Sequence, residues 1–412
     1  MIRGPLVSRP KMGVFVFYGL SKMQHLMSTY NRLPLTFTRG EGVWLEDIEG
    51  KKYLDALSGI AVCGLGHCHP DISKAICEQA STLLHTSNLY EIPLQTQLAG
   101  RLAKLTGMDK VFFTNSGAEA NEAAIKIARL YGHKKGMDTP SILVCQGSFH
   151  GRTMATLSAS GNRKVRAGFE PLLRGFSRIP YNDLDAVRDA ATNDPNVVAI
   201  LVEPVQGESG IRVPDEAYLS SLREVCDKNG WLLMLDEIQT GLCRSGKWFC
   251  HQHAGIVPDV MTLAKALGNG LPIGACVVNN EAANVFEPGN HGSTFGGNPL
   301  ASATSLAVLN VLERDNLAEQ AARSGELLQK LFNGALRDNA HVKDIRGIGL
   351  LFAIELDRPC GELVMKAADK GLLINVTAET VIRLLPPLIC SESDIREIAD
   401  RLIPLIEEFL VQ

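Results

Sequence analysis

The chain has 412 residues, enough for about two or three domains with substantial buried cores. Hydrophobic residues make up 45% of it and charged residues 21%, a composition typical of globular proteins in water. The net charge of −4 offers no basic surface for nucleic acid, and no apolar run approaches the roughly 20 residues that span a membrane. We therefore expect neither a nucleic-acid partner nor a membrane partner.

The N-terminal 40 residues contain several basic residues but no Asp or Glu. A short apolar patch, Gly13 to Leu20, is not followed by a clear cleavage site. We favour an upstream start over a targeting peptide, with residues 1–26 as an extension and the folded chain beginning near Met23 or Met27.

A strand–turn–strand pattern from Arg39 to Gly50 leads into a further strand at 53–57. Short apolar runs then alternate with helical patterns, which predicts an α/β doubly wound domain with buried parallel strands. The runs are 111–114, 141–145, 197–202, 231–235 and 260–263.

From about Leu306 onward, long helical patterns surround strand-like runs at 349–355 and 381–385. We expect residues 76–308 to form a large cofactor-binding domain and residues 309–412 a smaller α+β domain. Residues 27–75 are expected to contribute to the small domain.

The run at 111–114 leads into a helix start of the kind that binds anions. Ser116 is placed as an N-cap, with Glu119 three residues later as in a capping box. Gly117 lets a ligand approach the backbone, and free N–H groups at a helix start favour a phosphate. Ala120, Ala124, Ile127 and Tyr131 form one apolar face, and Gly132 can end the helix. An ordinary capped helix is the alternative.

Two further runs are followed by side chains that can take part in catalysis. Asp236 and Glu237 follow the run at 231–235, and Lys265 follows the run at 260–263. Neighbouring strands would bring Asp236 and Lys265 to the same sheet edge, where α/β sheets bind ligands. Solvated strand ends are the alternative.

An aspartate, a lysine and an anion-binding helix start are what pyridoxal 5'-phosphate (PLP) requires: a pyridinium partner, a Schiff-base amine and a phosphate cradle. The dinucleotide fingerprint, the P-loop and the G-x-S-x-G motif are absent from the sequence. The histidines at 67 and 69, like those at 251 and 253, lack partners at metal-site spacing, so we predict no metal.

Ten cysteines are scattered along the chain without a C-x-x-C pair. In a chain of this length, that spacing indicates reduced thiols in the cytoplasm and not a disulfide framework.

Six ordered segments resemble the class III aminotransferases of PLP fold type I. The segments are Ser116–Glu122, Phe149–Thr153, Glu203–Glu208, Leu235–Gly241, Thr262–Lys265 and His291–Pro299. The resemblance covers about residue 31 to the C-terminus. It implies a mostly parallel seven-stranded sheet flanked by helices, together with a smaller α+β domain.

The resemblance assigns the cofactor roles. Lys265 would carry PLP and act as the proton-shuttling base, and Asp236 would keep the pyridine nitrogen protonated. Gln239 would bond near the phenolic oxygen, and Phe149 would stack on the ring. The phosphate cradle would comprise Ser116, Gly117, Ala118 and, from the other subunit of a homodimer with shared active sites, Thr294.

Two arginines suit the carboxylates of the substrates. By resemblance, Arg383 grips the α-carboxylate of glutamate and Arg152 its side-chain carboxylate. With an ω-amine donor, Glu208 would pair with Arg383, and Arg152 would take the donor's α-carboxylate. Ser293 is a further expected substrate contact.

The implied reaction is transamination of N2-acetylornithine with 2-oxoglutarate, giving N-acetylglutamate 5-semialdehyde and glutamate in arginine biosynthesis. Ile60 stands where relatives that act on free ornithine usually carry a tyrosine, which favours an N-acylated donor. Succinylornithine, ornithine and 4-aminobutyrate remain alternative donors. A non-catalytic protein of the PLP fold is a further alternative, motivated by departures from the family pattern at Ser209, Cys243 and Asn269.

Overall fold

The computed structural model describes residues 25–411. Residues 1–24, most of the expected N-terminal extension, lie outside the described part. The chain divides into two units, Met1–Thr36 and Phe37–Gln412. Residues 25–36 contain no helix or strand, so the fold below is that of the second unit alone.

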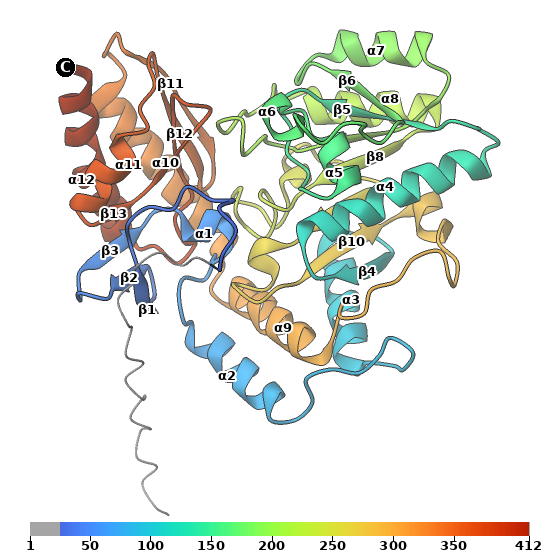
Figure 1. The fold of residues 1–412 in the computed structure, drawn as a ribbon, viewed down its shortest axis with the longest axis horizontal. Helices are drawn as coiled ribbons and strands as arrows, with labels where there is room; N and C mark the ends of the chain where they lie inside the picture. Colours follow the sequence, from blue (N-terminus) through green and yellow to red (C-terminus); the bar gives the residue numbers. More distant parts are fainter. Residues whose placement is uncertain (1–24, 412) are drawn as a thin grey trace, which may run out of the picture. The chain divides into compact units, whose positions relative to one another are not determined.

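The centre of this unit is a seven-stranded sheet in the order β4-β10-β9-β8-β7-β5-β6 (Figure 1). The pairs from β9 to β6 are parallel, and β10 is antiparallel to both its neighbours. The expected mostly parallel seven-stranded sheet is therefore confirmed. The strands are β4 (Lys110–Thr114), β5 (Ser141–Cys145), β6 (Phe176–Ile179), β7 (Val197–Val202), β8 (Leu232–Asp236), β9 (Val260–Leu263) and β10 (Gly274–Val278).

Alternate residues of the central strands enter two separate cores. Ile142 and Val144 of β5 pack in one core with α4, whereas Leu143 and Cys145 pack in another with α8. The sheet is thus a layer between helices, as expected for an α/β domain. The helices of this part are α2 (Pro70–Ala80), α3 (Pro93–Thr106), α4 (Gly117–Lys134), α5 (Met154–Ala159), α6 (Arg163–Arg166), α7 (Leu184–Asn193), α8 (Tyr218–Asn229) and α9 (Pro299–Arg314).

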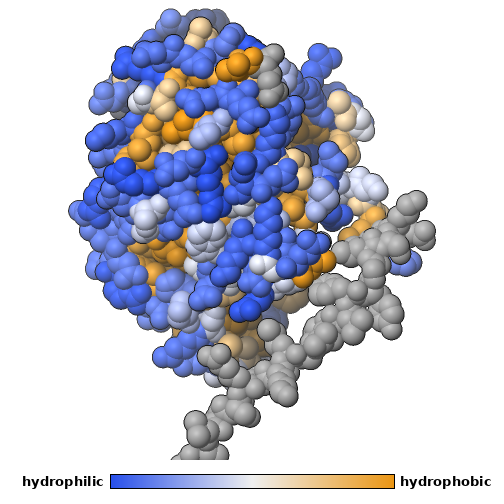
Figure 2. Space-filling model, turned by 90° about the vertical axis from the view of Figure 1, so that its left-hand side faces the viewer, coloured by the Kyte–Doolittle hydropathy of each residue, from blue (hydrophilic) through white to orange (hydrophobic). Residues whose placement is uncertain are grey.

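A smaller α+β part is built from both ends of the unit. Its C-terminal strands form an antiparallel sheet in the order β11-β12-β15-β14, and α10 packs on β11 and β12. The N-terminal strands form a second sheet in which β3 pairs with β13 from the C-terminal region. The face on the side of α10, α11 and α12 is mostly hydrophilic, with its apolar residues in separate patches (Figure 2). The exact domain boundaries stay a prediction.

The elements of the smaller part are β1 (Phe37–Glu41), β2 (Trp44–Asp47), β3 (Lys52–Asp55), α1 (Ser58–Ala61), α10 (Leu317–Leu336), β11 (Val342–Ile348), β12 (Leu351–Leu356), α11 (Leu363–Asp369), β13 (Leu372–Leu373), β14 (Asn375–Thr377), β15 (Val381–Leu384) and α12 (Glu392–Val411).

The five apolar runs form strands, but two strands of the sheet were not anticipated. Strand β10 lies between β4 and β9 and is antiparallel to both. Strand β4, which contains the run at 111–114, therefore points in the same direction as the parallel strands but does not pair with them. Strand β6 extends the opposite edge and contains the polar residues Ser177 and Arg178, which hide its strand character in the sequence.

The expectation that Gly132 ends its helix is wrong, because α4 continues to Lys134. The residue is a glycine for a different reason. A Cβ at this position would lie 2.5 Å from Pro140 Cβ and 2.8 Å from Val198 Cγ1. Gly132 therefore lets α4 pack closely against the neighbouring strand and turn.

We predict opposite effects for two helical glycine-to-alanine substitutions. Gly132→Ala should lower the free energy of unfolding by about 1–3 kcal/mol, because the added methyl overpacks the contact. Gly100→Ala in α3 should raise it by about 0.5–1 kcal/mol, since nothing lies within 4 Å of the added Cβ and alanine favours the helix. Denaturant unfolding of both variants tests this, and a stabilising Gly132→Ala would contradict the packing argument.

Candidate functional site

The site lies where β8 and β9 end. These strands are neighbours, and Asp236 at the end of β8 is in register with Thr262 of β9, three residues before Lys265. A cavity of about 450 Å³ opens at this edge. Of the predicted site residues, those that line it are Ser116, Gly117, Ala118, Phe149, Arg152, Glu208, Asp236, Gln239 and Lys265. The structure thus brings them together, and their roles stay predictions.

Lys265 begins a 3-10 turn two residues after the end of β9 and has a φ of 45°. This left-handed conformation is uncommon for a residue with a long side chain and is typical of functional positions. Burial lowers the pKa of Lys265, and the positive charge of Arg383 adds to this, against the opposing effects of Glu208 and Asp236. A larger unprotonated fraction makes the amine a better nucleophile.

Asp236 is only 4% exposed, and its carboxylate receives three hydrogen bonds. Asn121 Nδ2 and His150 Nδ1 each lie 2.8 Å from Oδ2, and the Ile238 N–H donates to Oδ1 over 3.1 Å. The carboxylate orientation is therefore fixed from three directions.

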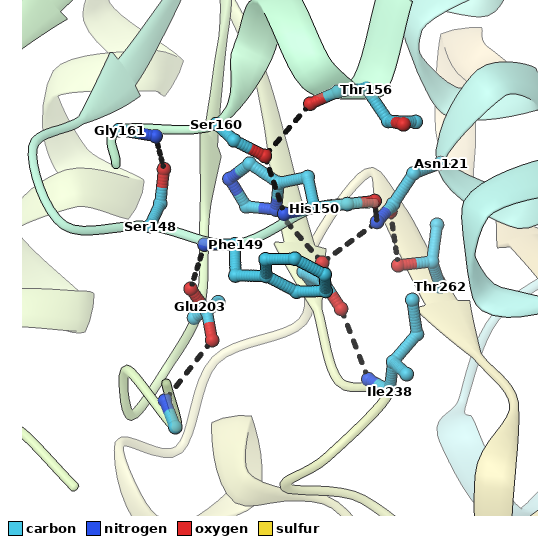
Figure 3. A network of polar contacts seen from close by, with 12 residues as sticks. Asn121, Ser148, Phe149, His150, Thr156, Ser160, Gly161, Glu203, Ile238 and Thr262 are labelled. Atoms are coloured by element: carbon cyan, nitrogen blue, oxygen red, sulfur yellow. Dashed lines mark hydrogen bonds and ion pairs between the residues drawn. The ribbon is translucent and has the colours of Figure 1, made fainter. Parts of the chain in front are cut away.

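Glu203 supports the loop that carries Phe149 (Figure 3). Its carboxyl oxygens accept from the N–H of Phe149 over 2.8 Å and of Gly207 over 3.1 Å. Burial raises the pKa of Glu203 to about 7; the nearby Asp236 also raises it, whereas His150 lowers it. Glu203, which also lines the cavity, thus fixes the backbone of Phe149 at the cavity wall.

The helix start at Ser116 has the expected cap, with one difference. Ser116 Oγ accepts from the Glu119 N–H over 3.2 Å, which confirms the first half of the capping box. The Glu119 carboxylate accepts from the N–H of Asn115 over 2.7 Å, whereas a capping box would use the N–H of Ser116, one residue later. The first intrahelical hydrogen bond runs from Ala120 to Ser116, so the N–H groups of Gly117 and Ala118 precede it.

Two glycines of the site are fixed by close contacts. A Cβ on Gly117 would lie 2.7 Å from Ile238 Cδ1, and a Cβ on Gly207 would collide with Gln239 Oε1. Within the described residues, Gln239 Oε1 is also buried without a hydrogen-bond partner. An amide oxygen that is buried without a partner fits a hydrogen-bond donor of a ligand beside it.

Arg383 lies in β15, is fully buried and does not line the cavity. Its Nη1 is 2.6 Å from Glu208 Oε1, and its Nε donates to Asn375 Oδ1 over 3.1 Å. Burial acts to raise the pKa of Glu208, but the charge and hydrogen bond of Arg383 act to lower that pKa. The charge of Lys265 and the hydrogen bond from Gln239 add to this effect, so the pKa is lowered overall. The chain thus contains the Glu208–Arg383 pair expected for an ω-amine donor.

Arg152 differs from Arg383 in being exposed at the cavity. Its guanidinium carbon lies 5.6 Å from the centre of the Phe149 ring, a cation–π contact that leaves the N–H groups free to bind a carboxylate.

Ser293 and Thr294 are not among the residues that line the cavity. Ser293 Oγ accepts from Asn115 Nδ2 over 3.3 Å and from the Gly296 N–H over 3.0 Å, and Thr294 is exposed. One chain does not bring these two residues to Lys265.

Two of the three departures from the family pattern, Asn269 and Ser209, have local explanations, and Cys243 has none. Asn269 has a φ of 45°, which asparagine tolerates, and its side chain bonds the backbone of Leu65 over 2.8 Å and of Gly66 over 3.2 Å. Ser209 Oγ donates to the Gly147 carbonyl. Cys243 is buried at a φ of 70°, where glycine would be less strained.

Sequence reasoning missed Asn121, His150 and Glu203 as parts of the site. The signal for Asn121 is a polar residue on the stripe that also contains the buried Ala124, Ile125 and Ala128 of α4. For Glu203, the signal is an acid that directly follows the fully buried strand β7.

Residues 25–411 contain neither a metal-binding cluster nor a membrane-spanning helix. No group of three or more His, Cys, Asp and Glu side chains there is arranged to hold a metal ion. No helix in the same range is both long enough and apolar enough for a membrane span.

Comparisons with known proteins agree with the geometry. A family model described as Aminotransferase class-III matches residues 26–406. The acetylornithine aminotransferase of Nitrosomonas europaea is 56% identical over 388 residues, covering 94% of this chain and 99% of that protein. Acetylornithine aminotransferase 1 of Bordetella pertussis is 53% identical over 387 residues, covering 94% of this chain and 98% of the other.

Solved structures show the same relationship. The ornithine aminotransferase of Toxoplasma gondii superposes with a TM-score of 0.91 at 36% identity, covering 94% of each chain. The acetylornithine aminotransferase of Elizabethkingia anophelis gives a TM-score of 0.84 at 36% identity, covering 94% of this chain and 97% of that one. The chain belongs to the class III aminotransferases.

Proposed function

We propose that the protein uses PLP to transfer the δ-amino group of N2-acetylornithine to 2-oxoglutarate. The products would be N-acetylglutamate 5-semialdehyde and glutamate, and the reaction would serve arginine biosynthesis. The observation that carries the proposal is the convergence of Lys265, Asp236 and the start of α4 on one cavity. The names of relatives at 53–56% identity support the choice of donor.

The residues of the cavity fit PLP. The N–H groups of Gly117 and Ala118 precede the first intrahelical bond of α4 and suit a phosphate. The half-buried Lys265 has a lowered pKa and suits an aldehyde. The carboxylate of Asp236 suits a protonated ring nitrogen, and the unpartnered end of Gln239 suits a polar ring substituent.

When bound, PLP supplies an electron sink for the charge that develops on the donor carbon. Asp236 would hold the proton on the ring nitrogen. Lys265 Nζ would attach the cofactor and, once released, move a proton to or from the donor carbon. Phe149 would cover one face of the ring, in a loop held by Glu203.

Two arginine sites would allow one cavity to accept two different substrates. With N-acetylornithine, Arg152 would bind the α-carboxylate, while the Glu208–Arg383 pair stays closed. With 2-oxoglutarate, Glu208 would have to release Arg383, which then binds the second carboxylate. This exchange would avoid leaving the buried Arg383 unpaired in either half of the reaction.

We further propose a homodimer that shares its active sites. Thr294 and Ser293 lie outside the cavity lining of their own chain. The neighbouring Phe295 is 57% exposed, and the loop at 83–92 that lies against this segment exposes Leu89 by 87% and Tyr90 by 70%. A second copy would bury this apolar surface and could bring Thr294 to the phosphate of its partner.

We place the protein in the cytoplasm, because the ten cysteines are all free thiols. Free ornithine is the second candidate donor, supported by the higher TM-score to the Toxoplasma gondii ornithine aminotransferase. Ile60 is 38% exposed and does not line the cavity of its own chain, so the choice of an acylated donor rests more on the named relatives than on the missing tyrosine hydroxyl.

Donor titration tests the proposed reaction. N-acetylornithine should convert the visible absorption of the PLP-loaded protein, and 2-oxoglutarate should restore it. The kcat/KM for N-acetylornithine should exceed those for succinylornithine, ornithine and 4-aminobutyrate by about tenfold or more. If another donor has a higher kcat/KM than N-acetylornithine, that donor is the substrate. If the protein uses none of the four donors, it is non-catalytic.

Arg152→Lys should lower the kcat/KM for N-acetylornithine by about 10- to 100-fold, because a lysine cannot bind the carboxylate with two parallel hydrogen bonds. Arg163→Lys, in the exposed helix α6, is the control.

The pH dependence of cofactor capture tests the electrostatics around Lys265. Only the unprotonated amine attacks an aldehyde, and the charge of Glu208 raises the pKa of Lys265. Glu208→Gln removes that charge and leaves Arg383 unpaired, so both effects lower this pKa. The rate of PLP capture by apo-protein should therefore reach half its maximum at a lower pH. Glu313→Gln, on the exposed face of α9, should leave the profile unchanged. A shift to higher pH would contradict the assignment.

A further inference from the structure

Asn121 makes contacts that no role assigned so far explains. It lies near the start of α4 with 0% exposure, and its side chain makes three hydrogen bonds, all of 2.8 Å. Its Nδ2 donates to Asp236 Oδ2 and to the His150 carbonyl, and its Oδ1 accepts from Thr262 Oγ1 (Figure 3).

These partners permit only one orientation of the amide. Asp236 Oδ2 and the His150 carbonyl are both acceptors, so the atom that faces them must be the NH2 group. The hydroxyl of Thr262 can donate, and it faces Oδ1. Both N–H donors are therefore used, and turning the amide over would place an oxygen against two other oxygens.

The three partners belong to three different segments that carry proposed cofactor residues. Asp236 ends β8, His150 follows Phe149 in the loop after β5, and Thr262 lies in β9 three residues before Lys265. Asn121 itself is on the helix whose start offers the N–H groups of Gly117 and Ala118. One side chain thus connects the start of α4 with the segments that carry Asp236, Phe149 and Lys265.

We infer that Asn121 is a positioning residue that fixes the carboxylate of Asp236 and the Phe149–His150 loop relative to the phosphate-binding end of α4. The inference rests on the proposed function, since it concerns the binding of PLP. Asn121 itself is not among the residues that line the cavity, so it acts through Asp236 and the loop.

His150 does not make Asn121 redundant. His150 Nδ1 also reaches Asp236 Oδ2, but its backbone carbonyl is held by Asn121. Its Nε2 is buried and has no partner among the residues that the structure describes. Losing Asn121 would therefore remove one bond to the carboxylate and loosen the loop that supplies the second.

The test compares PLP binding by apo-proteins, measured by absorbance titration together with the pH dependence of the visible spectrum. Asn121→Asp keeps the shape of the side chain but replaces both N–H donors with an oxygen. We expect its PLP dissociation constant to rise by about 10- to 100-fold, as for other residues that orient a ligand group from behind. We also expect the pH dependence of its spectrum to shift, because the new carboxyl group lies where an N–H donor lay 2.8 Å from Asp236 and competes with it for a proton.

Thr262→Val is the milder variant, because it removes only the donor to Asn121 Oδ1, and its dissociation constant should rise by about three- to tenfold. Thr304→Val is the matched control. Thr304 is equally buried in α9, and among the described residues its hydroxyl bonds only the Leu300 carbonyl, so PLP binding should stay within about twofold of wild type. Thermal unfolding of each apo-protein separates a loss of binding from a loss of folding.

Unchanged affinity and spectrum in a folded Asn121→Asp would overturn the inference while leaving the proposed function intact. If that variant does not fold, Thr262→Val decides: weakened binding supports the inference, and binding equal to that of Thr304→Val overturns it. A wild-type protein that gains no visible band with PLP would instead refute the proposed function, and the inference with it.

Discussion

The buried carboxylate of Asp236 is the constraint on which the arrangement of the site depends. An unpaired carboxylate at 4% exposure would cost roughly 2 kcal/mol or more, so donors must reach it from elsewhere in the chain. Asn121 supplies one from α4, His150 one from the loop after β5, and the Ile238 N–H one from the following turn. These three hydrogen bonds hold helix, loop and strand in the relative position that forms the cavity.

Charged side chains of opposite sign lie close together around the cavity. Arg383 is fully buried against Glu208, and only Glu208 of the two lines the cavity. Lys265 lies near both charges and near Asp236, and the loss of water contact decides the direction of its pKa shift. This arrangement is consistent with the proposal that Lys265 acts as a nucleophile and that Arg383 binds a second substrate carboxylate.

The sequence predicts the parts of the site that depend on strand topology. Asp236 and Lys265 each follow a short apolar run, and parallel neighbouring strands bring such positions together without any knowledge of side-chain packing. The start of α4 is likewise readable from Ser116, because capping is a local interaction. Contacts that depend on packing could not be predicted from the sequence. The sequence around Gly132 suggests a helix end, but this glycine allows a close contact of α4 with its neighbours. In the sequence, Asn121 resembles an ordinary helical residue, yet its side chain bonds Asp236.

The central claim is that Lys265 is the amine that holds the cofactor. Borohydride reduction of the PLP-loaded protein, followed by proteolysis and mass spectrometry, tests it most directly, because reduction makes the link between lysine and cofactor permanent. The account predicts a pyridoxyl group on the peptide that contains Lys265, and none on that peptide in Lys265→Ala. A pyridoxyl group on a different lysine, or on none, would contradict it.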